Sequence, residues 1–275
     1  MIKSLKFIVL TIGSFLLVIY ILAITYLYFN QESLIFQPEI LAKDYKFSFQ
    51  GDFKEMYIPV EKDVNLHGVL FRTQESKGLI FYLHGNGGSV KGWGDIGATY
   101  NQMGYDIFIL DYRGYGKSDG KISSEAQLFD DLKKAYNHLL SIYPESKIII
   151  TGYSIGTGLA AMLASENNPQ ALVLQAPYYS LKETINSTMP LMPDFLQKYD
   201  FETYKFLQKV KAPVCIFHGT ADTILPYSNS EKLRSVFKKN DMLVTLPGEG
   251  HNTITDNELF KTEFKKFADR MLNTN

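Results

Sequence analysis

The sequence predicts an α/β fold with about eight strands in a mostly parallel sheet and helices on both of its faces. Short apolar runs, rich in isoleucine, leucine, valine and phenylalanine, alternate with segments whose apolar residues keep helical spacing. Such continuous apolar runs are typical of parallel strands that are buried on both faces. With 275 residues and a hydrophobic content of 45%, the chain has enough apolar material for one large domain or two small ones.

The N-terminal segment is expected to precede this fold as a membrane anchor. Lys3 and Lys6 come before an uncharged apolar run. As a helix, residues 7–29 would span about 34 Å, which is enough for a hydrocarbon core of about 30 Å. We therefore divide the chain into an anchor at residues 1–30 and a domain at residues 31–275.

A cleaved signal peptide is the alternative interpretation of this segment. The apolar run is long for a signal peptide, and no convincing Ala-x-Ala cleavage site follows it. Tyr20, Tyr26 and Tyr28 gather towards its far end, as in an aromatic belt at a membrane surface. These features favour an uncleaved, single-pass anchor. Because lysines beside such an anchor stay in the cytoplasm, Lys3 and Lys6 place the domain on the non-cytoplasmic side.

The first elements of the domain are expected to be an antiparallel pair of strands at residues 53–60 and 64–72. Six further apolar runs predict strands at residues 78–83, 105–110, 148–151, 171–175, 213–217 and 242–246. Helices are expected between them at about residues 90–103, from the capping Ser123 and Ser124 to about 142, at 157–164, at 228–239 and at 259–271.

Residues 177–211 interrupt this alternation. They are rich in methionine, proline and aromatic residues but have little regular period. We expect them to form a short helical insertion that acts as a cap or lid.

Composition excludes several functions. The net charge of −1 gives no reason to expect a nucleic-acid partner. Cys215 is the only cysteine and lies in an apolar run, so neither a disulfide framework nor a cysteine metal site is possible. The five histidines show no HxxxH or HxH spacing. We expect no metal and no cofactor.

Five polar motifs each follow a predicted strand. In open α/β sheets, functional groups gather beyond the carboxyl ends of the strands, so this shared position carries more weight than any single motif. The motifs are HGNGG (84–88), DYRGYGKS (111–118), GYSIG (152–156), HGTAD (218–222) and GEGHN (248–252).

Ser154 is the expected nucleophile. It is expected in a sharp turn between a strand of β-branched residues and a helix of small residues. In this context, the G-x-S-x-G motif indicates a nucleophilic serine. Gly152 and Gly156 flank it because side chains there would collide across the turn. The following helix N-terminus favours the negative charge that develops when a serine attacks a carbonyl.

A serine hydroxyl is a weak nucleophile and needs a general base. His251 is the expected base because it follows the last strand among small and polar residues. His67 lies in the N-terminal hairpin and His138 in a helix that is expected to face solvent. His84 and His218 open loops directly after strands, where they are expected to shape turns.

The histidine in turn needs an acid that fixes its tautomer and stabilises the imidazolium. Asp222 is the expected acid, since it lies just after the strand at residues 213–217 and between the serine and the histidine in sequence. Asp200 in the cap is the main alternative, followed by Asp194. Asp241 and Asp256 flank structural elements and are expected at the surface or in helix caps.

The oxyanion needs two backbone donors. The N–H of Ile155, directly after the serine, is one candidate, and the N–H of Asn86 in the HGNGG loop is the other. A phosphate-binding loop is a weaker interpretation of HGNGG. Neither a lysine followed by serine or threonine at Walker spacing nor a G-x-G-x-x-G pattern is present.

Together the five motifs, in this order over roughly residues 50–272, resemble the α/β-hydrolase superfamily. The sequence is most similar to the branch with serine-aminopeptidase-like hydrolases, monoacylglycerol-lipase-like enzymes and membrane-associated protein depalmitoylases. One departure is conservative: Leu225 precedes Pro226 where the branch often has valine. The resemblance implies an α/β-hydrolase fold, and it implies support of the site by the DYRGYGKS loop, with Tyr112 and Arg113 as braces.

The resemblance also implies the triad Ser154, Asp222 and His251 and the oxyanion donors Asn86 and Ile155. We therefore expect a membrane-anchored serine hydrolase that cleaves a carboxylic ester or thioester through an acyl-enzyme. Its partners would be a small acyl ester or acylated substrate and the membrane, with no nucleic acid.

Two other functions remain open. An aminopeptidase-like hydrolase would need an anionic pocket for a free amine, which acids of the cap could supply: Glu183, Asp194, Asp200 and Glu202. A non-catalytic binding protein on this scaffold is disfavoured because no member of the triad is missing.

Overall fold

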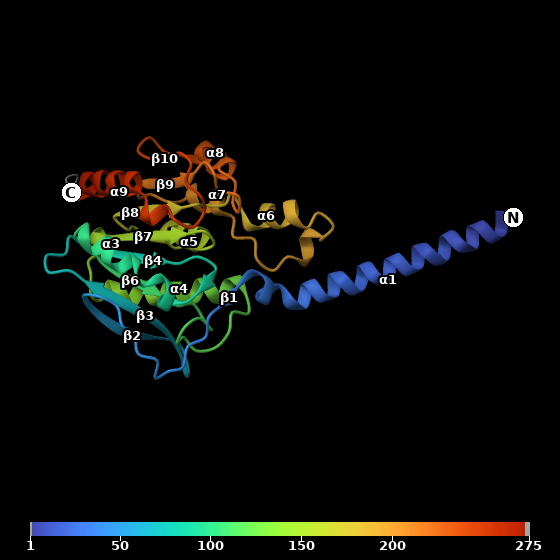
Figure 1. Ribbon diagram of the computed structural model, residues 1–275, viewed down its shortest axis with the longest axis horizontal. Helices are drawn as coiled ribbons and strands as arrows, with labels where there is room; N and C mark the ends of the chain where they lie inside the picture. Colours follow the sequence, from blue (N-terminus) through green and yellow to red (C-terminus); the bar gives the residue numbers. More distant parts are fainter. Residues whose placement is uncertain (1, 273–275) are drawn as a thin grey trace.

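An eight-stranded sheet forms the centre of the computed structural model, which describes residues 2–272 (Figure 1). The strand order is β10-β9-β8-β7-β4-β6-β3-β2. Strand β3 (Val64–Arg72) pairs antiparallel with both β2 (Asp52–Glu61) and β6, and all other neighbours are parallel. The remaining strands are β4 (Leu79–Leu83), β6 (Asp106–Leu110), β7 (Ile148–Tyr153), β8 (Ala171–Gln175), β9 (Val214–Gly219) and β10 (Met242–Leu246). The predicted fold class is confirmed.

Strand β4 lies at the centre of the sheet, between β7 and β6. Its last residue, Leu83, is in register with Gly152 of β7 and with Leu110 of β6. The loops that follow these three strands therefore leave the sheet side by side, at its carboxyl edge.

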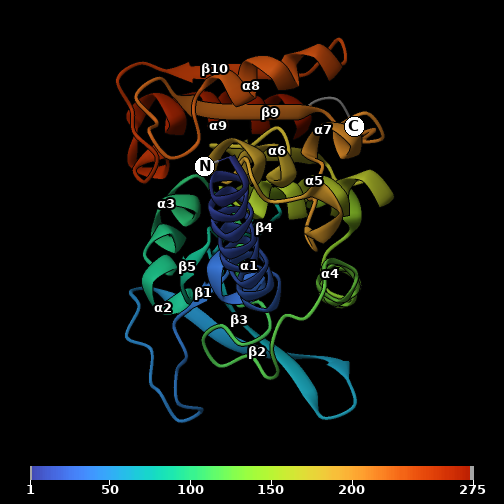
Figure 2. The same ribbon diagram turned by 90° about the vertical axis from the view of Figure 1, so that its right-hand side faces the viewer.

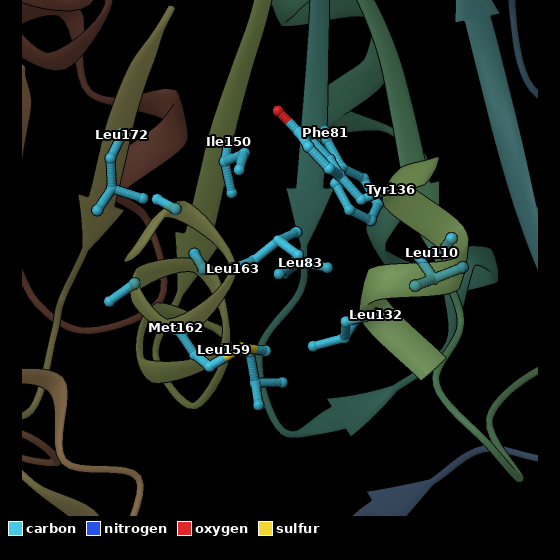
Figure 3. Close-up of a cluster of buried hydrophobic side chains, with 14 of the residues drawn as sticks. Phe81, Leu83, Leu110, Leu132, Tyr136, Ile150, Leu159, Met162, Leu163 and Leu172 are labelled. Carbon is cyan, nitrogen blue, oxygen red and sulfur yellow. The ribbon is translucent and has the colours of Figure 1, made fainter. Parts of the chain in front are cut away.

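Helices cover both faces of the sheet, because alternate residues of each strand point to opposite faces. On one face, Phe81 and Leu83 of β4 pack against Leu132 of α4 (Glu125–Leu140) and Leu159 of α5 (Gly156–Glu166) (Figure 3). On the other face, a second core contains residues of α3 (Ile96–Gln102) and α9 (Glu258–Leu272). Shorter elements complete the chain: β1 (Gln37–Pro38), β5 (Gly87–Gly88), α8 (Ser228–Leu233), and 3-10 turns at Glu145–Lys147, Arg234–Val236 and Ile254–Asp256.

The helix predicted at residues 90–103 is broken in two. It consists of α2 (Val90–Trp93) and α3, with Gly94 between them. A Cβ atom on Gly94 would lie 2.2 Å from the ring of Phe49, so the break lets this ring pack against bare backbone. The helix predicted at residues 228–239 is also shorter, because α8 ends at Leu233 and a 3-10 turn follows.

Helix α1 (Ile2–Ile35) projects from the sheet edge as a single long helix (Figures 1 and 2). It is longer than the predicted anchor, because it continues beyond residue 30 to Ile35. No proline occurs before Pro38, and the N–H of Phe36 still bonds to the Glu32 carbonyl at 2.8 Å. By length and composition, α1 could cross a membrane.

The cap consists of α6 (Leu181–Thr188), a 3-10 turn at Asp194–Leu196, and α7 (Thr203–Leu207). The short helical insertion predicted at residues 177–211 is thus observed. Figure 1 shows α6 and α1 on the same side of the sheet, beyond its carboxyl edge.

Candidate active site

Ser154 occupies a strained turn between β7 and α5. Its φ is +52°, a left-handed conformation that non-glycine residues rarely adopt. A Cβ atom on Gly156 would lie 2.1 Å from the Leu83 carbonyl oxygen, and one on Gly152 would lie 2.4 Å from the Gly156 carbonyl oxygen. The Ser154 N–H donates to the Gln175 carbonyl at 2.9 Å, which ties the turn to β8. The two glycines therefore allow the turn that exposes the serine.

The structure brings the three predicted side chains into one hydrogen-bonded row. Ser154 Oγ lies 3.0 Å from His251 Nε2, and His251 Nδ1 lies 2.7 Å from Asp222 Oδ2. The Tyr153 hydroxyl donates to the His251 carbonyl, which holds the histidine loop against the turn that carries Ser154. In this order, a histidine can accept the serine proton while the aspartate keeps a proton on its other nitrogen.

Asp222 is buried and accepts hydrogen bonds on both oxygens. Oδ1 accepts from the N–H groups of Ile224 and Leu225, while Oδ2 faces both His251 and His218. Burial raises the pKa of the Asp222 carboxyl, but the hydrogen bonds from His218, His251 and Leu225 outweigh burial and hold the pKa below its usual value. The carboxyl is therefore ionised at neutral pH.

Sequence reasoning missed the contact between His218 and the candidate acid. His218 Nε2 lies 3.2 Å from Asp222 Oδ2 and 2.9 Å from the Leu225 carbonyl oxygen. Because a carbonyl can only accept, Nε2 carries a proton, and Nδ1 lies 2.6 Å from the Ser230 hydroxyl. The sequence feature that could have indicated this contact is the presence of both residues in the same short HGTAD loop.

Asn86 and Ile155, the candidate oxyanion donors, line the same pocket as Ser154. The Tyr115 hydroxyl donates to the Asn86 carbonyl at 2.9 Å, and the Gln37 N–H donates to Asn86 Oδ1 at 3.1 Å. Short pairing of β5 with β1 also joins this loop to the chain that leaves α1. The HGNGG loop is thus held from both sides.

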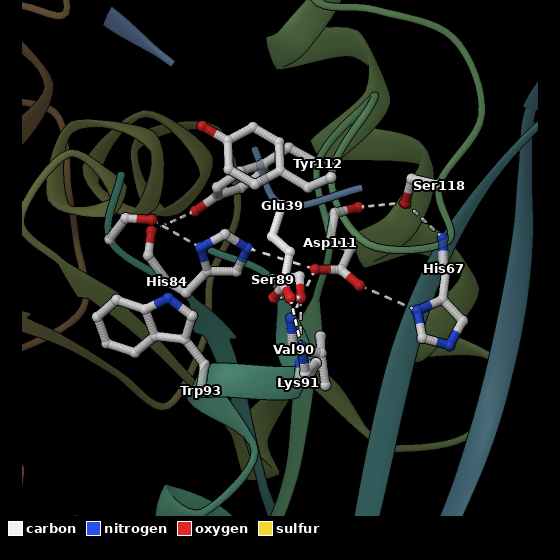
Figure 4. Close-up of polar contacts among 12 residues, drawn as sticks. Glu39, His67, His84, Ser89, Val90, Lys91, Trp93, Asp111, Tyr112 and Ser118 are labelled. Atoms are coloured by element: carbon white, nitrogen blue, oxygen red, sulfur yellow. Dashed lines mark hydrogen bonds and ion pairs between the residues drawn. The ribbon is translucent and has the colours of Figure 1, made fainter. Parts of the chain in front are cut away.

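His84 anchors the start of the same loop. Its Nδ1 donates to the Gly85 carbonyl at 2.7 Å, and its own carbonyl accepts from the Tyr112 hydroxyl at 2.8 Å (Figure 4). Burial lowers the pKa of His84, although Asp111 opposes this shift. His84 therefore shapes the turn, as predicted, and Tyr112 acts as a brace.

A buried polar network beneath the loop centres on Asp111 (Figure 4). Its Oδ1 accepts from the Val90 N–H at 2.8 Å, and its Oδ2 lies 3.1 Å from His67 Nδ1. Ser118 donates to the Asp111 carbonyl at 2.6 Å and accepts from the His67 N–H at 2.8 Å. The predicted support from the DYRGYGKS loop is therefore observed, whereas the part played by His67 was not predicted.

Arg113 makes the second bracing contact of this loop. Its Nε and Nη2 atoms lie 2.5 and 2.9 Å from the two oxygens of buried Asp131 on α4. Its Nη1 lies 2.9 Å from Glu61 at the end of β2. Arg113 thus fastens the loop after β6 to a helix and to the sheet edge.

The alternative acids of the cap lie apart from this row. Asp194 pairs with Lys182 at 3.2 Å. The backbone N–H of Asp200 is bound by Glu125 at 2.7 Å, and neither aspartate lines the Ser154 pocket. The structure thus joins Asp222, rather than the alternatives, to His251.

A pocket of about 440 Å³ opens above Ser154, and its walls are mostly apolar. Among the described residues that line it, none carries a carboxylate. The walls come from the cap, the loops and the end of α1, and they include Leu34, Ile35, Trp93, Tyr178, Leu181, Ile185, Met189 and Ile224. Within residues 2–272, no group of three or more His, Cys, Asp or Glu side chains is arranged to hold a metal ion.

The chain is similar to known proteins in both sequence and structure. Residues 74–200 match the family described as Serine aminopeptidase, S33. The chain is 28% identical to an uncharacterized protein of Mycobacterium tuberculosis over 83% of each chain. It is also 28% identical to the protein bem46 of Schizosaccharomyces pombe over 65% of this chain and 63% of that protein. An esterase from Pyrococcus furiosus matches in structure with a TM-score of 0.68 over 86% of this chain and 98% of the esterase, at 22% identity.

The sheet order, the strained serine turn and the structural match show an α/β-hydrolase fold. This is the fold that the five motifs of the chain predicted. Its matched central segment is similar to serine aminopeptidases of the S33 type.

Proposed function

We propose that this protein is a membrane-anchored serine hydrolase that cleaves carboxylic esters or thioesters of acyl chains. The observation that carries the proposal is the hydrogen-bonded row Ser154–His251–Asp222 at the base of an apolar pocket. The pocket walls suit the hydrocarbon part of an acyl group, and the serine suits its carbonyl carbon.

The chemistry proceeds in two steps. Ser154 Oγ attacks the acyl carbonyl while His251 Nε2 takes its proton, and Asp222 stabilises the imidazolium. The N–H groups of Asn86 and Ile155 stabilise the oxyanion. The C–O or C–S bond breaks as His251 returns the proton to the leaving alcohol or thiol. Water then loses a proton to His251 and attacks the acyl carbonyl. The bond to Ser154 Oγ breaks, His251 returns the proton to Oγ, and the acid is released.

The pocket favours an acyl substrate over a peptide with a free amine. A free amine needs a carboxylate, and none is present among the described residues that line the pocket. Three of the four cap acids that could have supplied one are paired with lysines: Glu183 with Lys232, Asp194 with Lys182 and Glu202 with Lys205. We therefore prefer ester or thioester hydrolysis to aminopeptidase activity.

Helix α1 supports the membrane part of the proposal. It is exposed along its apolar length and long enough to cross a bilayer. Lys3 and Lys6 at its start favour a cytoplasmic N-terminus, with the hydrolase domain on the other side.

A fluorophosphonate probe tests the nucleophile. We expect it to label the wild-type protein and Ser165→Ala, whose serine lies on α5 outside the pocket, but not Ser154→Ala. Hydrolysis of p-nitrophenyl acyl esters should fall about 10⁴-fold or more in Ser154→Ala. A folded wild-type protein that neither labels nor cleaves any ester of an acyl-length series would refute the proposal.

The same assay separates the second candidate function. We expect no release of p-nitroaniline from aminoacyl p-nitroanilides under conditions in which the acyl esters are cleaved. Cleavage of the anilides without cleavage of the esters would instead support an aminopeptidase.

A further inference from the structure

The cap makes hydrogen bonds and an ion pair with α1 near the C-terminal end of this helix. Gln31 is buried there, and its side chain donates to the Leu196 carbonyl at 2.8 Å and accepts from the Lys198 N–H at 2.9 Å. Lys198 Nζ also lies 3.2 Å from Glu32, which accepts from the Tyr199 hydroxyl at the same distance. These contacts fix where the cap stands relative to α1.

A second contact lies further along α1. The Tyr20 hydroxyl donates to the Leu191 carbonyl at 2.9 Å. Tyr20 precedes Gln31 by roughly three turns, or about 16 Å along the helix. The cap thus follows α1 well into its apolar run, so the medium that surrounds Tyr20 also surrounds Leu191.

The segment at this second contact, residues 189–195, is here named the cap tip. Its side chains are mostly apolar, and Leu191 and Phe195 are 76% and 83% exposed. Its one charged residue, Asp194, forms an ion pair with Lys182 of the cap at 3.2 Å. Adjacent exposed apolar side chains of this size are typical of a surface that contacts a membrane or another apolar partner.

The backbone of the cap tip is also suited to a medium that offers few hydrogen bonds. Pro190 and Pro193 have no N–H, and the N–H groups of Met189 and Met192 bond to carbonyls within the cap. The carbonyl of Leu191 is occupied by Tyr20. Unsatisfied backbone groups are costly in lipid, and this loop covers several of its own.

The depth of the cap tip follows from the length of α1. Counted from Lys6, about 20 residues of helix fill a hydrocarbon core of about 30 Å, so the core ends near Tyr26. Tyr20 then lies about 9 Å inside that boundary, within the range of about 5–10 Å to which interfacial apolar segments insert. Leu191 lies at the depth of Tyr20.

We propose that the cap tip is inserted into the same bilayer as α1 and admits acyl chains from that leaflet to Ser154. The inference rests on the membrane-anchored hydrolase proposed above. The pocket supports it, because Met189 of the cap tip, Ile185 of α6 and Leu34 of α1 all line its walls. The substrate is then an acyl ester or thioester whose chain resides in the membrane.

Fluorescence quenching tests the insertion without any need for activity. Cys215 is buried, so an NBD label can be placed selectively on Leu191→Cys in the full-length protein. The matched control is Ile142→Cys, 48% exposed, beyond the end of α4 and near the amino end of β7. In phosphatidylcholine vesicles, we expect acyl-chain nitroxides to quench the label at 191 and aqueous iodide to quench the label at 142. Equal quenching of both labels by iodide would overturn the proposal.

Activity tests the role of the cap tip in substrate delivery. Neither Leu191 nor Phe195 lines the pocket, so Leu191→Glu/Phe195→Glu should cleave soluble p-nitrophenyl butyrate at the wild-type rate. We expect about tenfold slower hydrolysis of a long-chain ester held in vesicles, because two charges oppose insertion. The control Ile142→Glu should match the wild type on both substrates. If the double variant hydrolysed the vesicle substrate at the wild-type rate, the role of the cap tip in delivery would be refuted. If the wild-type protein were inactive on both substrates, the proposed function would be refuted, and the quenching result alone would decide insertion.

Discussion

At the scale of single residues, Asp222 is bound by more partners than the orientation of one histidine requires. Two backbone N–H groups and two imidazoles surround its carboxylate. His218 contacts the same carboxylate oxygen as His251, and Ser230 in turn contacts His218. The base is thus positioned by a chain of buried groups that begins on α8.

This environment predicts how stability depends on pH. Since the pKa of Asp222 is lowered from 3.8 in the folded protein, its carboxylate contributes stability that is complete well above 3.8. This stability is lost as the pH falls from 3.8 through the lower pKa of the folded protein. We expect the difference in unfolding free energy between the wild type and Asp222→Asn to stay constant from about pH 7 to about pH 5 and to narrow below about pH 4. Urea denaturation of the full-length proteins at each pH measures it. A difference that widens with acidification would contradict the assigned direction of the shift.

The candidate triad could be predicted because its members follow strands whose carboxyl ends must meet at one edge of a parallel sheet. The contact of His67 with Asp111 beneath the HGNGG loop could not be predicted in this way. His67 meets Asp111 only because β3 pairs antiparallel with β6, and that pairing brings Gly68 opposite Leu110. Such a contact depends on sheet register, which the spacing of residues in the sequence does not reveal.

At the scale of elements, the site depends on how closely α5 approaches the sheet. Its first turn rests on the end of β4, where Gly156 faces the Leu83 carbonyl, and Gly158 faces the Tyr178 hydroxyl. Any side chain at these positions would push α5 outwards and carry Ser154 away from His251.

We therefore expect Gly156→Ala to destabilise the fold by about 3 kcal/mol or more, because its Cβ would meet a backbone oxygen that cannot move aside. Gly92 is the matched control, since a Cβ there meets no atom within 4 Å, and Gly92→Ala should be neutral or slightly stabilising. Thermal unfolding of both variants measures the effect. Equal melting temperatures for the two variants would show that the turn at Ser154 tolerates a side chain at position 156.

The sequence predicted the type and order of the elements better than their ends. Strands were recognisable because burial on both faces requires continuous apolar runs. The break between α2 and α3 depends on Phe49, a residue distant in sequence that packs on Gly94. The continuation of α1 to Ile35 follows from the absence of glycine and proline between residues 30 and 35.

At the scale of the whole molecule, α1, the cap and the motif-bearing loops all lie at one end of the protein (Figures 1 and 2). The pairing of β1 with β5 links the segment directly after the C-terminal end of α1 to the HGNGG loop. If α1 spans a bilayer, the carboxyl edge of the sheet must therefore face that bilayer, and the amino edge must face away from it.

The orientation of the chain gives the last prediction. Lys3 and Lys6 favour a cytoplasmic N-terminus, so the domain should be exposed on the opposite side. In right-side-out membrane vesicles, we expect a membrane-impermeant maleimide to label Ile142→Cys directly and Ser4→Cys only after detergent is added. Buried Cys215 gives little background. The reverse pattern would place the domain in the cytoplasm, where its substrates would come from the inner leaflet. Release of the domain from the vesicles without detergent would show that α1 is removed as a signal peptide.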